Sequence, residues 1–388
     1  MKTRVHSIDV VRGVVMIIMA LDHCRDLLHF SSLFLNPTDL SQTTPGLFAA
    51  RWITHLCAPT FVFLSGVSVY LSMQRSENSS SLAAFLRMRE LWLILLEITV
   101  VNFAIWFDVH FRLVMIQVIG AIGFGFILLS FLLKVAPKKI GIAALIIIAL
   151  HNLLQLVSLP ANPAVAAVFN ILVAPGLLSV SPSFSILISY PIIQWTAIML
   201  LGFAVGQIFT QERTRMNARL LRYGLVSLLV FVLLRFVNLY GDPAPWQSQK
   251  STLFNIFSFF NVTKYPPSLQ YILLFLGIAF LLLRFANNLP SVVKKVLIIY
   301  GQVPMFYYLL HFYLIRLATF IMVFAQGFSY KDLLFGPFQF GRPAHSSGVG
   351  LMAVVAIWLL IVALLYPLCK WYGTYKRNHP EKDWLRYL

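Results

Sequence analysis

The sequence is poor in charge and in cysteine. Charged residues make up 11% of its 388 residues, whereas hydrophobic residues make up 59% and the mean hydropathy is +0.82. A soluble domain carries roughly 25% charged and about 45–50% apolar residues. This composition therefore excludes an ordinary soluble globular protein. Three cysteines are too few for a disulfide framework, and they leave open only a bridge between Cys24 and Cys57.

Several short motifs of soluble enzymes are also missing. The chain has no HExxH or CxxC metal motif, no P-loop, no GxGxxG phosphate loop and no serine nucleophile elbow. We therefore expect no metal site. No repeat of 20–50 residues is visible, and matching halves with Gly- or Pro-broken helices, which are typical of inverted-repeat transporters, are not seen.

What the chain does contain is a series of apolar runs of about 20 residues. That length suits helices crossing roughly 30 Å of hydrocarbon, and the runs lack the period-2 alternation of barrel strands. We predict an all-α polytopic bundle of about ten transmembrane helices, forming a single domain over residues 1–388. The expected spans are 9–30, 54–73, 86–107, 113–133, 140–158, 186–208, 223–241, 268–287, 297–323 and 349–369.

The net charge is +17, and the Lys and Arg residues that produce it concentrate in alternate loops of the chain rather than on one surface. Basic residues concentrate in cytoplasmic loops of membrane proteins, so this pattern predicts that both termini are cytoplasmic. It argues against a nucleic-acid partner and allows attraction of an anionic cofactor or lipid at the inner face. The inner segments hold 21 of the 30 basic residues, namely Lys2, Arg4, Arg12, Arg75, Arg87, Arg89, Lys134, Lys138, Lys139, Arg213, Arg215, Arg219, Arg222, Arg284, Lys294, Lys295, Lys370, Lys376, Arg377, Lys382 and Arg386.

One apolar segment, 160–182, does not fit this series. It is interrupted by Pro160, Pro163, Pro175 and Pro182. A full span there would reverse every later loop and place the basic segments outside. We therefore interpret it as an interfacial or re-entrant element.

The first predicted helix carries an unusual number of ionisable residues, which are costly inside a membrane and mark candidate functional sites. Arg12 and His23 lie about 20° apart around the helix axis and roughly 16 Å apart along it. A guanidinium at the inner end and an imidazole further out would suit a long anionic donor. Asp26 follows His23 by three residues and could orient the imidazole. Asp22 points about 100° away from His23.

Two later helices add candidates. Arg51 and His55 share a helix face, Pro59 frees a backbone carbonyl, and Gly66 permits close approach of another helix or a ligand. In the ninth span, His311 is central and Pro304 marks a kink. Glu97 in the third predicted span requires either a proton or a partner, which the sequence does not identify.

At these residues the sequence resembles the transmembrane acyltransferase superfamily. The opening SIDVVRGVVMIIMALDHCRD matches its arginine, ten residues, then histidine pattern at Arg12 and His23. The segment TFVFLSG at 60–66 resembles part of the second helix. The segment YGQVPMFYYLLH at 300–311 resembles the bacterial heparan-alpha-glucosaminide N-acetyltransferase-like proteins, which are related to acyltransferase family 3.

This resemblance implies an acyl-CoA-dependent O- or N-acyltransferase in the bacterial inner membrane. It would move an acyl group, acetyl in the first instance, from cytoplasmic acyl-CoA to a sugar or glycan on the opposite side. The resemblance assigns the donor to Arg12, with Arg87 and Arg89 assisting. His23 is the catalytic candidate, with Asp26 or His55 assisting; since the lysosomal member's catalytic histidine lies later, His29 or His55 is an alternative.

We assign Asp22, Arg51 and His311 to the acceptor substrate. Direct transfer and an acyl-histidine intermediate both remain open, as does a homo-oligomer. Two other classes of function also remain. A transporter or flippase for a glycan or anionic solute would use the buried charges as a path, and a structural scaffold would make them dispensable.

Overall fold

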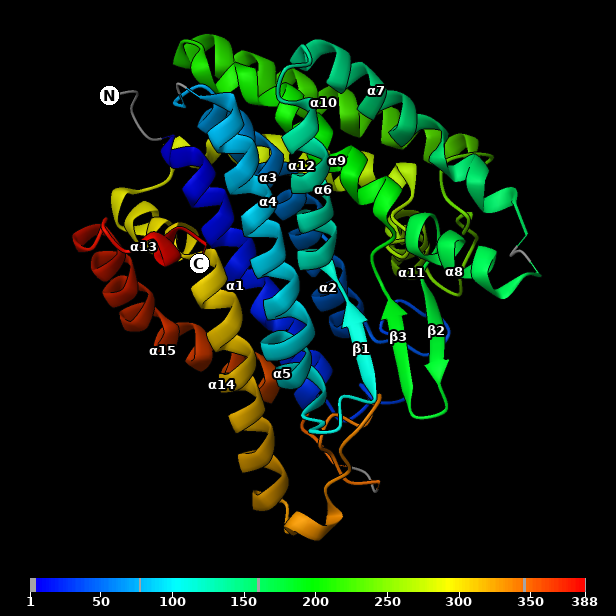
Figure 1. Ribbon diagram of the computed structural model, residues 1–388. Coiled ribbons are helices and arrows are strands. Elements are labelled where there is room, and N and C mark those ends of the chain that lie inside the picture. Colours follow the sequence, from blue (N-terminus) through cyan, green and yellow to red (C-terminus); the bar gives the residue numbers. More distant parts are fainter. Residues whose placement is uncertain (1–4, 77, 159–160, 345–346, 388) are drawn as a thin grey trace.

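The computed structural model describes residues 5–76, 78–158, 161–344 and 347–387, and these residues are mostly helical (Figure 1). Lys2, Arg4 and Pro160 lie outside the described residues. The helices are α1 (His6–Leu28), α2 (Pro45–Thr54), α3 (Cys57–Met73), α4 (Ser79–Leu96), α5 (Asn102–Trp106), α6 (Val118–Leu132), α7 (Pro137–Leu150), α8 (Pro163–Leu172), α9 (Ile192–Val205), α10 (Arg213–Val237), α11 (Thr252–Phe260), α12 (Leu269–Phe285), α13 (Ser291–Gln302), α14 (Pro304–Ala325) and α15 (Leu351–Asn378).

Within the described residues, seven helical stretches are long and apolar enough to cross a membrane. The remaining three expected spans differ from the prediction in specific ways. Span 9–30 is the continuous helix α1, but it carries many charges. Span 86–107 is divided by a π-helical turn, Glu97–Val101, and the apolar helix in span 113–133 is the 15-residue α6. The helical membrane architecture is therefore confirmed, whereas the count of about ten is not. The seven are Pro45–Met73, Pro137–Leu154, Ile192–Thr210, Arg213–Val237, Leu269–Asn288, Pro304–Ala325 and Leu351–Asn378.

A small sheet, which an all-α prediction omits, lies at one end of the helices. It contains β1 (Leu113–Ile116), β2 (Gly176–Ser181) and β3 (Phe184–Ile188) in the order β1-β3-β2, with β1 parallel to β3 and β2 antiparallel to β3. The segment 160–182 thus contributes the ten-residue α8 and strand β2 instead of a continuous span. Because Ile116 of β1 is paired with Ile188 of β3, the sheet brings Gln117 near Tyr190, and both line the same cavity.

Close helix crossings depend on glycine. A methyl group at Gly66 in α3 would lie 2.0 Å from the carbonyl oxygen of Met199 in α9, and one at Gly202 would lie 2.1 Å from that of Phe63. The expected close approach at Gly66 is therefore confirmed, with α9 as the partner. Gly13 in α1 and Gly301 in α13 form a second such crossing, against the backbone of Leu297 and Asp9 respectively.

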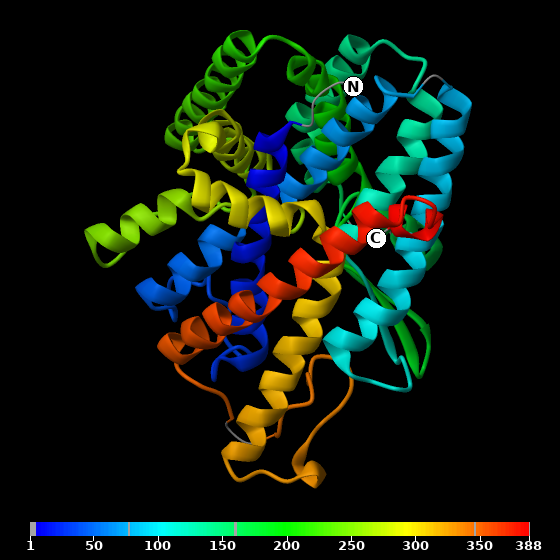
Figure 2. The ribbon, with the colours of Figure 1, turned by 90° about the vertical axis from the view of Figure 1, so that its left-hand side faces the viewer.

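Helix α1 runs through the interior and contacts α13, α14 and α15 (Figure 2). The expected kink at Pro304 is a complete break, because Val303 leaves helical geometry and separates α13 from α14. In both ribbon views the links α3–α4, α6–α7 and α9–α10 lie at the same end as the N-terminus, and the connection between α14 and α15 lies at the opposite end.

The cysteines Cys24, Cys57 and Cys369 are free and buried, so the bridge that the sequence left open is not formed.

Candidate active site

Two adjoining cavities lie along α1. Cavity 1, of about 390 Å³, is lined by His23, and cavity 2, of about 270 Å³, is lined by Arg12. Four lining residues belong to both cavities: Met19, Phe61, Val118 and Tyr308. These side chains come from α1, α3, α6 and α14, and we call them the partition because each of them lines both spaces. The Arg12–His23 face predicted for α1 thus borders two neighbouring cavities.

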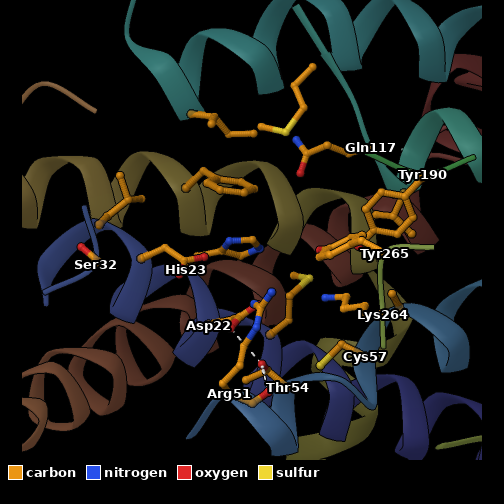
Figure 3. A pocket seen from close by; sticks show the side chains of 18 of the residues that line it. Asp22, His23, Ser32, Arg51, Thr54, Cys57, Gln117, Tyr190, Lys264 and Tyr265 are labelled. Carbon is orange, nitrogen blue, oxygen red and sulfur yellow. Dashed lines mark hydrogen bonds and ion pairs between the residues drawn. The ribbon is translucent and has the colours of Figure 1, made fainter. Parts of the chain in front are cut away.

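The His23 ring lies among aromatic side chains of α14. Its centroid is 4.3 Å from that of Phe312 and 5.2 Å from that of His311. Figure 3 shows the imidazole extending into cavity 1. His311 is fully buried, its Nδ1 lies 3.2 Å from the carbonyl oxygen of Tyr307, and its Nε2 has no hydrogen-bond partner among the described residues. His311 therefore supports the His23 ring from outside the cavity rather than lining it.

Asp22 is the centre of a buried polar cluster. Its carboxylate accepts hydrogen bonds from Arg51 at 2.6 Å and from the Thr54 hydroxyl at 2.8 Å, and it lies 2.8 Å from Arg25 (Figure 3). The two arginines and the threonine come from α1 and α2, so the cluster joins these helices. Asp22, Arg51 and Thr54 all line cavity 1.

The residues expected to assist His23 take different positions. Asp26 lines cavity 1, but its carboxylate pairs with Arg25 at 2.5 Å, and among the described residues it makes no hydrogen bond to His23. His55 is buried against Tyr271 and Phe275 and does not line either cavity. The structure therefore brings Asp26, but not His55, to the same cavity as His23.

Cavity 2 contains a group of cations. Arg12 donates hydrogen bonds to the Ser68 hydroxyl and, at 3.3 Å, to the carbonyl oxygen of Leu64. Arg89 from α4 and Lys376 from α15 also line this cavity. Arg87 does not: it is exposed and lies over the Phe131 ring. Arginine and lysine side chains of this kind could hold the phosphates of an anionic donor.

The sequence analysis did not identify several residues of cavity 1. Gln117, Tyr190, Lys264 and Tyr265 surround the space opposite α1 in Figure 3. They come from segments flanking the sheet and α12, whose approach to α1 depends on tertiary packing. One feature of the sequence could have singled out Lys264. It is a basic residue in a predicted outer loop, whereas most basic residues lie in predicted inner loops. Over the part of the chain that the structure describes, no group of three His, Cys, Asp or Glu side chains could hold a metal ion.

The partner of Glu97 is likewise resolved by the fold. Its Oε1 accepts the backbone N–H of Gln117 at 3.0 Å, at the N-terminus of α6. A methyl group at Gly120 would lie 2.5 Å from the other carboxylate oxygen. Glu97 therefore fixes the start of α6, and with it the backbone of Gln117 beside cavity 1.

These features define a helical membrane protein with a histidine beside charged side chains in one cavity and arginines in the cavity next to it. The family model for the heparan-alpha-glucosaminide N-acetyltransferase catalytic domain matches residues 4–235, more than half of the chain. The chain therefore belongs to that family, in agreement with the resemblance at Arg12, His23 and the second helix. No curated protein matches the chain.

Proposed function

We propose that this protein is a membrane acetyltransferase that transfers the acetyl group of acetyl-CoA to an amine or hydroxyl group of a glycan. The donor enters cavity 2 from the cytoplasm, and the acceptor enters cavity 1 from the opposite side of a bacterial inner membrane. Both termini lie in the cytoplasm, and residues 1–388 act as one transmembrane domain. The family match supports the acetyltransferase class, and the basic links at the N-terminal end of the molecule support the orientation.

Donor binding rests on the cations of cavity 2. Arg12, Arg89 and Lys376 bind the phosphates of acetyl-CoA through charge-assisted hydrogen bonds. The distance of roughly 16 Å along α1 between Arg12 and His23 allows an extended arm to pass the partition at Met19 and deliver the thioester to cavity 1. Arg87, which faces away from the cavity, has no direct role in this arrangement.

The chemistry takes place beside His23. In direct transfer, the acceptor nitrogen or oxygen attacks the thioester carbonyl carbon while the imidazole takes its proton. The tetrahedral intermediate then expels the thiolate, which takes up that proton and leaves as CoA. In the other route, the imidazole nitrogen attacks the thioester carbonyl carbon and displaces the thiolate, which takes up the proton that the ring gives up and leaves as CoA. The acceptor nitrogen or oxygen then attacks the acetyl-imidazole, and its proton passes to the released ring. His311 positions the His23 ring, and Asp22, Arg51 and Asp26 contribute polar groups for the acceptor.

The observation that carries this proposal is the adjacency of the two cavities along one face of α1. A purified sample is tested for CoA release from acetyl-CoA with glucosamine as acceptor. His23→Ala is expected to lower kcat by 10²-fold or more, whereas His110→Ala, which changes an exposed loop histidine, is expected to leave it unchanged. Full activity in His23→Ala would reject the assigned site.

Thermal stability distinguishes the enzyme from a transporter or flippase. Acetyl-CoA at 100 times its dissociation constant is expected to stabilise the protein by about 2.7 kcal/mol. A shift with acetyl-CoA that Arg12→Gln weakens supports a donor site in cavity 2. No shift with acetyl-CoA, together with a shift by a sugar-lipid, would instead favour transport.

A further inference from the structure

Gln117 carries a polar side chain that the proposed reaction leaves without a role. It directly precedes α6 and lines cavity 1, and Figure 3 shows its side chain reaching into that space from the side opposite α1. The nitrogen of its side-chain amide is buried and has no hydrogen-bond partner within the residues that the structure describes. A buried donor without a partner is costly, so this amide is suited to a ligand that accepts a hydrogen bond.

The backbone of Gln117 is fixed by two neighbours. Its N–H donates to Glu97 Oε1 at 3.0 Å, and the residue before it, Ile116, pairs with Ile188 in the sheet. The terminal amide has more freedom, because its last torsion has a broad energy minimum and allows either the nitrogen or the oxygen to face a ligand. The structure thus combines a fixed backbone with an amide that can turn its N–H groups into cavity 1.

Gln117 also adjoins the place where the two cavities meet, because the next residue, Val118, belongs to the partition. On the proposed path, an acetyl group that passes the partition from cavity 2 enters cavity 1 with His23 on the side of α1 and Gln117 on the side of α6 (Figure 3). Lys264 is another buried donor of this cavity, but its ammonium group lies on the side of Asp22. Gln117 is therefore the donor that faces the entering acetyl group across from the imidazole.

Transfer of an acetyl group places negative charge on the carbonyl oxygen. When the nucleophile bonds to the thioester carbon, the π electrons of the C=O bond move to the oxygen and a tetrahedral oxyanion forms. When this intermediate collapses, the C=O bond forms again, the C–S bond breaks, and the thiolate leaves as CoA with the proton that the imidazole ring gives up. The direct route and the acyl-histidine route both pass through such an oxyanion, so a donor aimed at it serves either route.

We propose that the side-chain amide of Gln117 donates a hydrogen bond to this oxyanion and is a further catalytic residue. The inference rests on the proposed function and adds to it a group that stabilises the transition state. Because the hydrogen bond strengthens as negative charge develops on the oxygen, it raises kcat and contributes little to the binding of acetyl-CoA.

The first test uses two variants with side chains of similar length. Gln117→Met removes the amide donor, and Gln117→Glu replaces it by a carboxylate, which only accepts hydrogen bonds. Each is expected to lower kcat roughly 10²-fold to 10³-fold, the loss typical of one oxyanion donor, and to leave the KM for acetyl-CoA and for glucosamine unchanged. Gln207→Met, which changes an exposed glutamine, is expected to leave kcat unchanged.

A second donor substrate tests the contact itself. In the dithioester analogue of acetyl-CoA, sulfur replaces the carbonyl oxygen, and sulfur is a weak hydrogen-bond acceptor. The wild type is expected to show a higher kcat with acetyl-CoA than with this analogue, and Gln117→Met is expected to reduce that oxygen-to-sulfur ratio roughly 10-fold or more. A partial loss of folded protein does not change the ratio, because both donors are measured on the same sample.

An unchanged kcat in Gln117→Met, or an oxygen-to-sulfur ratio that is equal in the wild type and this variant, would overturn the inference. Wild-type activity in Gln117→Glu, or a rise in the KM for glucosamine alone, would also overturn it, because the amide would then bind the acceptor instead of the oxyanion. The acetyltransferase itself stands in each of these cases. A wild-type protein that neither releases CoA nor is stabilised by acetyl-CoA would reject the proposed function, and with it this inference.

Discussion

Arg51 of α2 donates to the carboxylate of Asp22 in α1 at 2.6 Å, and this contact joins the two helices. Both residues line cavity 1, where Asp22 also receives the Thr54 hydroxyl and pairs with Arg25. The pair therefore fixes the wall of the cavity that lies beside His23. Its removal should affect both stability and the shape of the site.

We expect Asp22→Asn to destabilise the protein by about 3–5 kcal/mol, because it leaves Arg25 and Arg51 buried without their shared carboxylate. Thermal unfolding in detergent measures the loss. Asp26→Asn is the matched control: the Asp26 side chain is 45% exposed, so its change should cost about 1 kcal/mol or less. A smaller effect at Asp22 than at Asp26 would contradict this view of the cluster.

Arg89 and Arg87 offer a direct comparison within one helix. Arg89→Gln is expected to raise the KM for acetyl-CoA roughly 10-fold or more, since Arg89 lines cavity 2 and a hydrogen bond to a charged group contributes about 1.5–3 kcal/mol. Arg87→Gln should leave this KM unchanged, because its side chain is exposed over Phe131. Steady-state CoA release gives both values. An equal increase of the KM for acetyl-CoA in both variants would contradict donor binding in cavity 2.

The crossing of α3 and α9 should tolerate no side chain at Gly66. Gly66→Ala places a methyl group 2.0 Å from the carbonyl oxygen of Met199, and separation of the helices is expected to cost about 3 kcal/mol or more. Gly350→Ala serves as control, because its methyl group meets open space. The melting temperature and the yield of monodisperse protein measure the difference. Equal stability of the two variants would show that the helices are not this close.

Asp108 should contribute pH-dependent stability outside the spans. Burial raises the pKa of its carboxyl group, but hydrogen bonds from the Arg112 side chain and from the backbone N–H groups of His110 and Arg112 outweigh that effect and lower it. Because its pKa is lower in the folded state, the ionised carboxyl group stabilises the protein at pH values above its unfolded-state pKa of about 3.9. This stabilisation is lost as the pH falls through the folded-state pKa.

At pH 7, Asp108→Asn is therefore expected to lower stability by about 1 kcal/mol, a modest figure because the Arg112 side chain is 43% exposed. The difference from wild type should shrink below about pH 4. Thermal unfolding at several pH values measures it, with the exposed Glu381→Gln as control. A difference that stays constant from pH 7 to below pH 4 would exclude the carboxylate as the cause.

Much of the local structure can be predicted from the sequence, but little can be predicted of how distant segments pack together. The length of the apolar runs identifies membrane helices, and the positions of Gly66 and Pro304 correctly indicate a close crossing and an interruption. Periodicity places Arg12 and His23 on one face of α1, because that relation is internal to a single helix. The family is also visible in the sequence, because short motifs at Arg12, His23 and the second helix carry it.

What the sequence does not specify is which distant segments meet. Strand β1 pairs in parallel with β3, at the register Leu113↔Ser185, and the short apolar stretch of β1 continues directly into α6. A run of this kind does not distinguish a strand from part of a helix. Lys264 reaches cavity 1 only through the packing of the segment before α12, and the contact between Arg51 and Asp22 depends on the angle between α1 and α2.

The partition made by Met19, Phe61, Val118 and Tyr308 has a consequence for the cell as well as for the reaction. An enzyme that passes a chemical group across a bilayer must not let protons or other ions follow it. Under the proposed function, the apolar and aromatic side chains between the two cavities limit such a leak. Their replacement by small residues should therefore reveal itself first as a leak in the membrane potential of sealed vesicles.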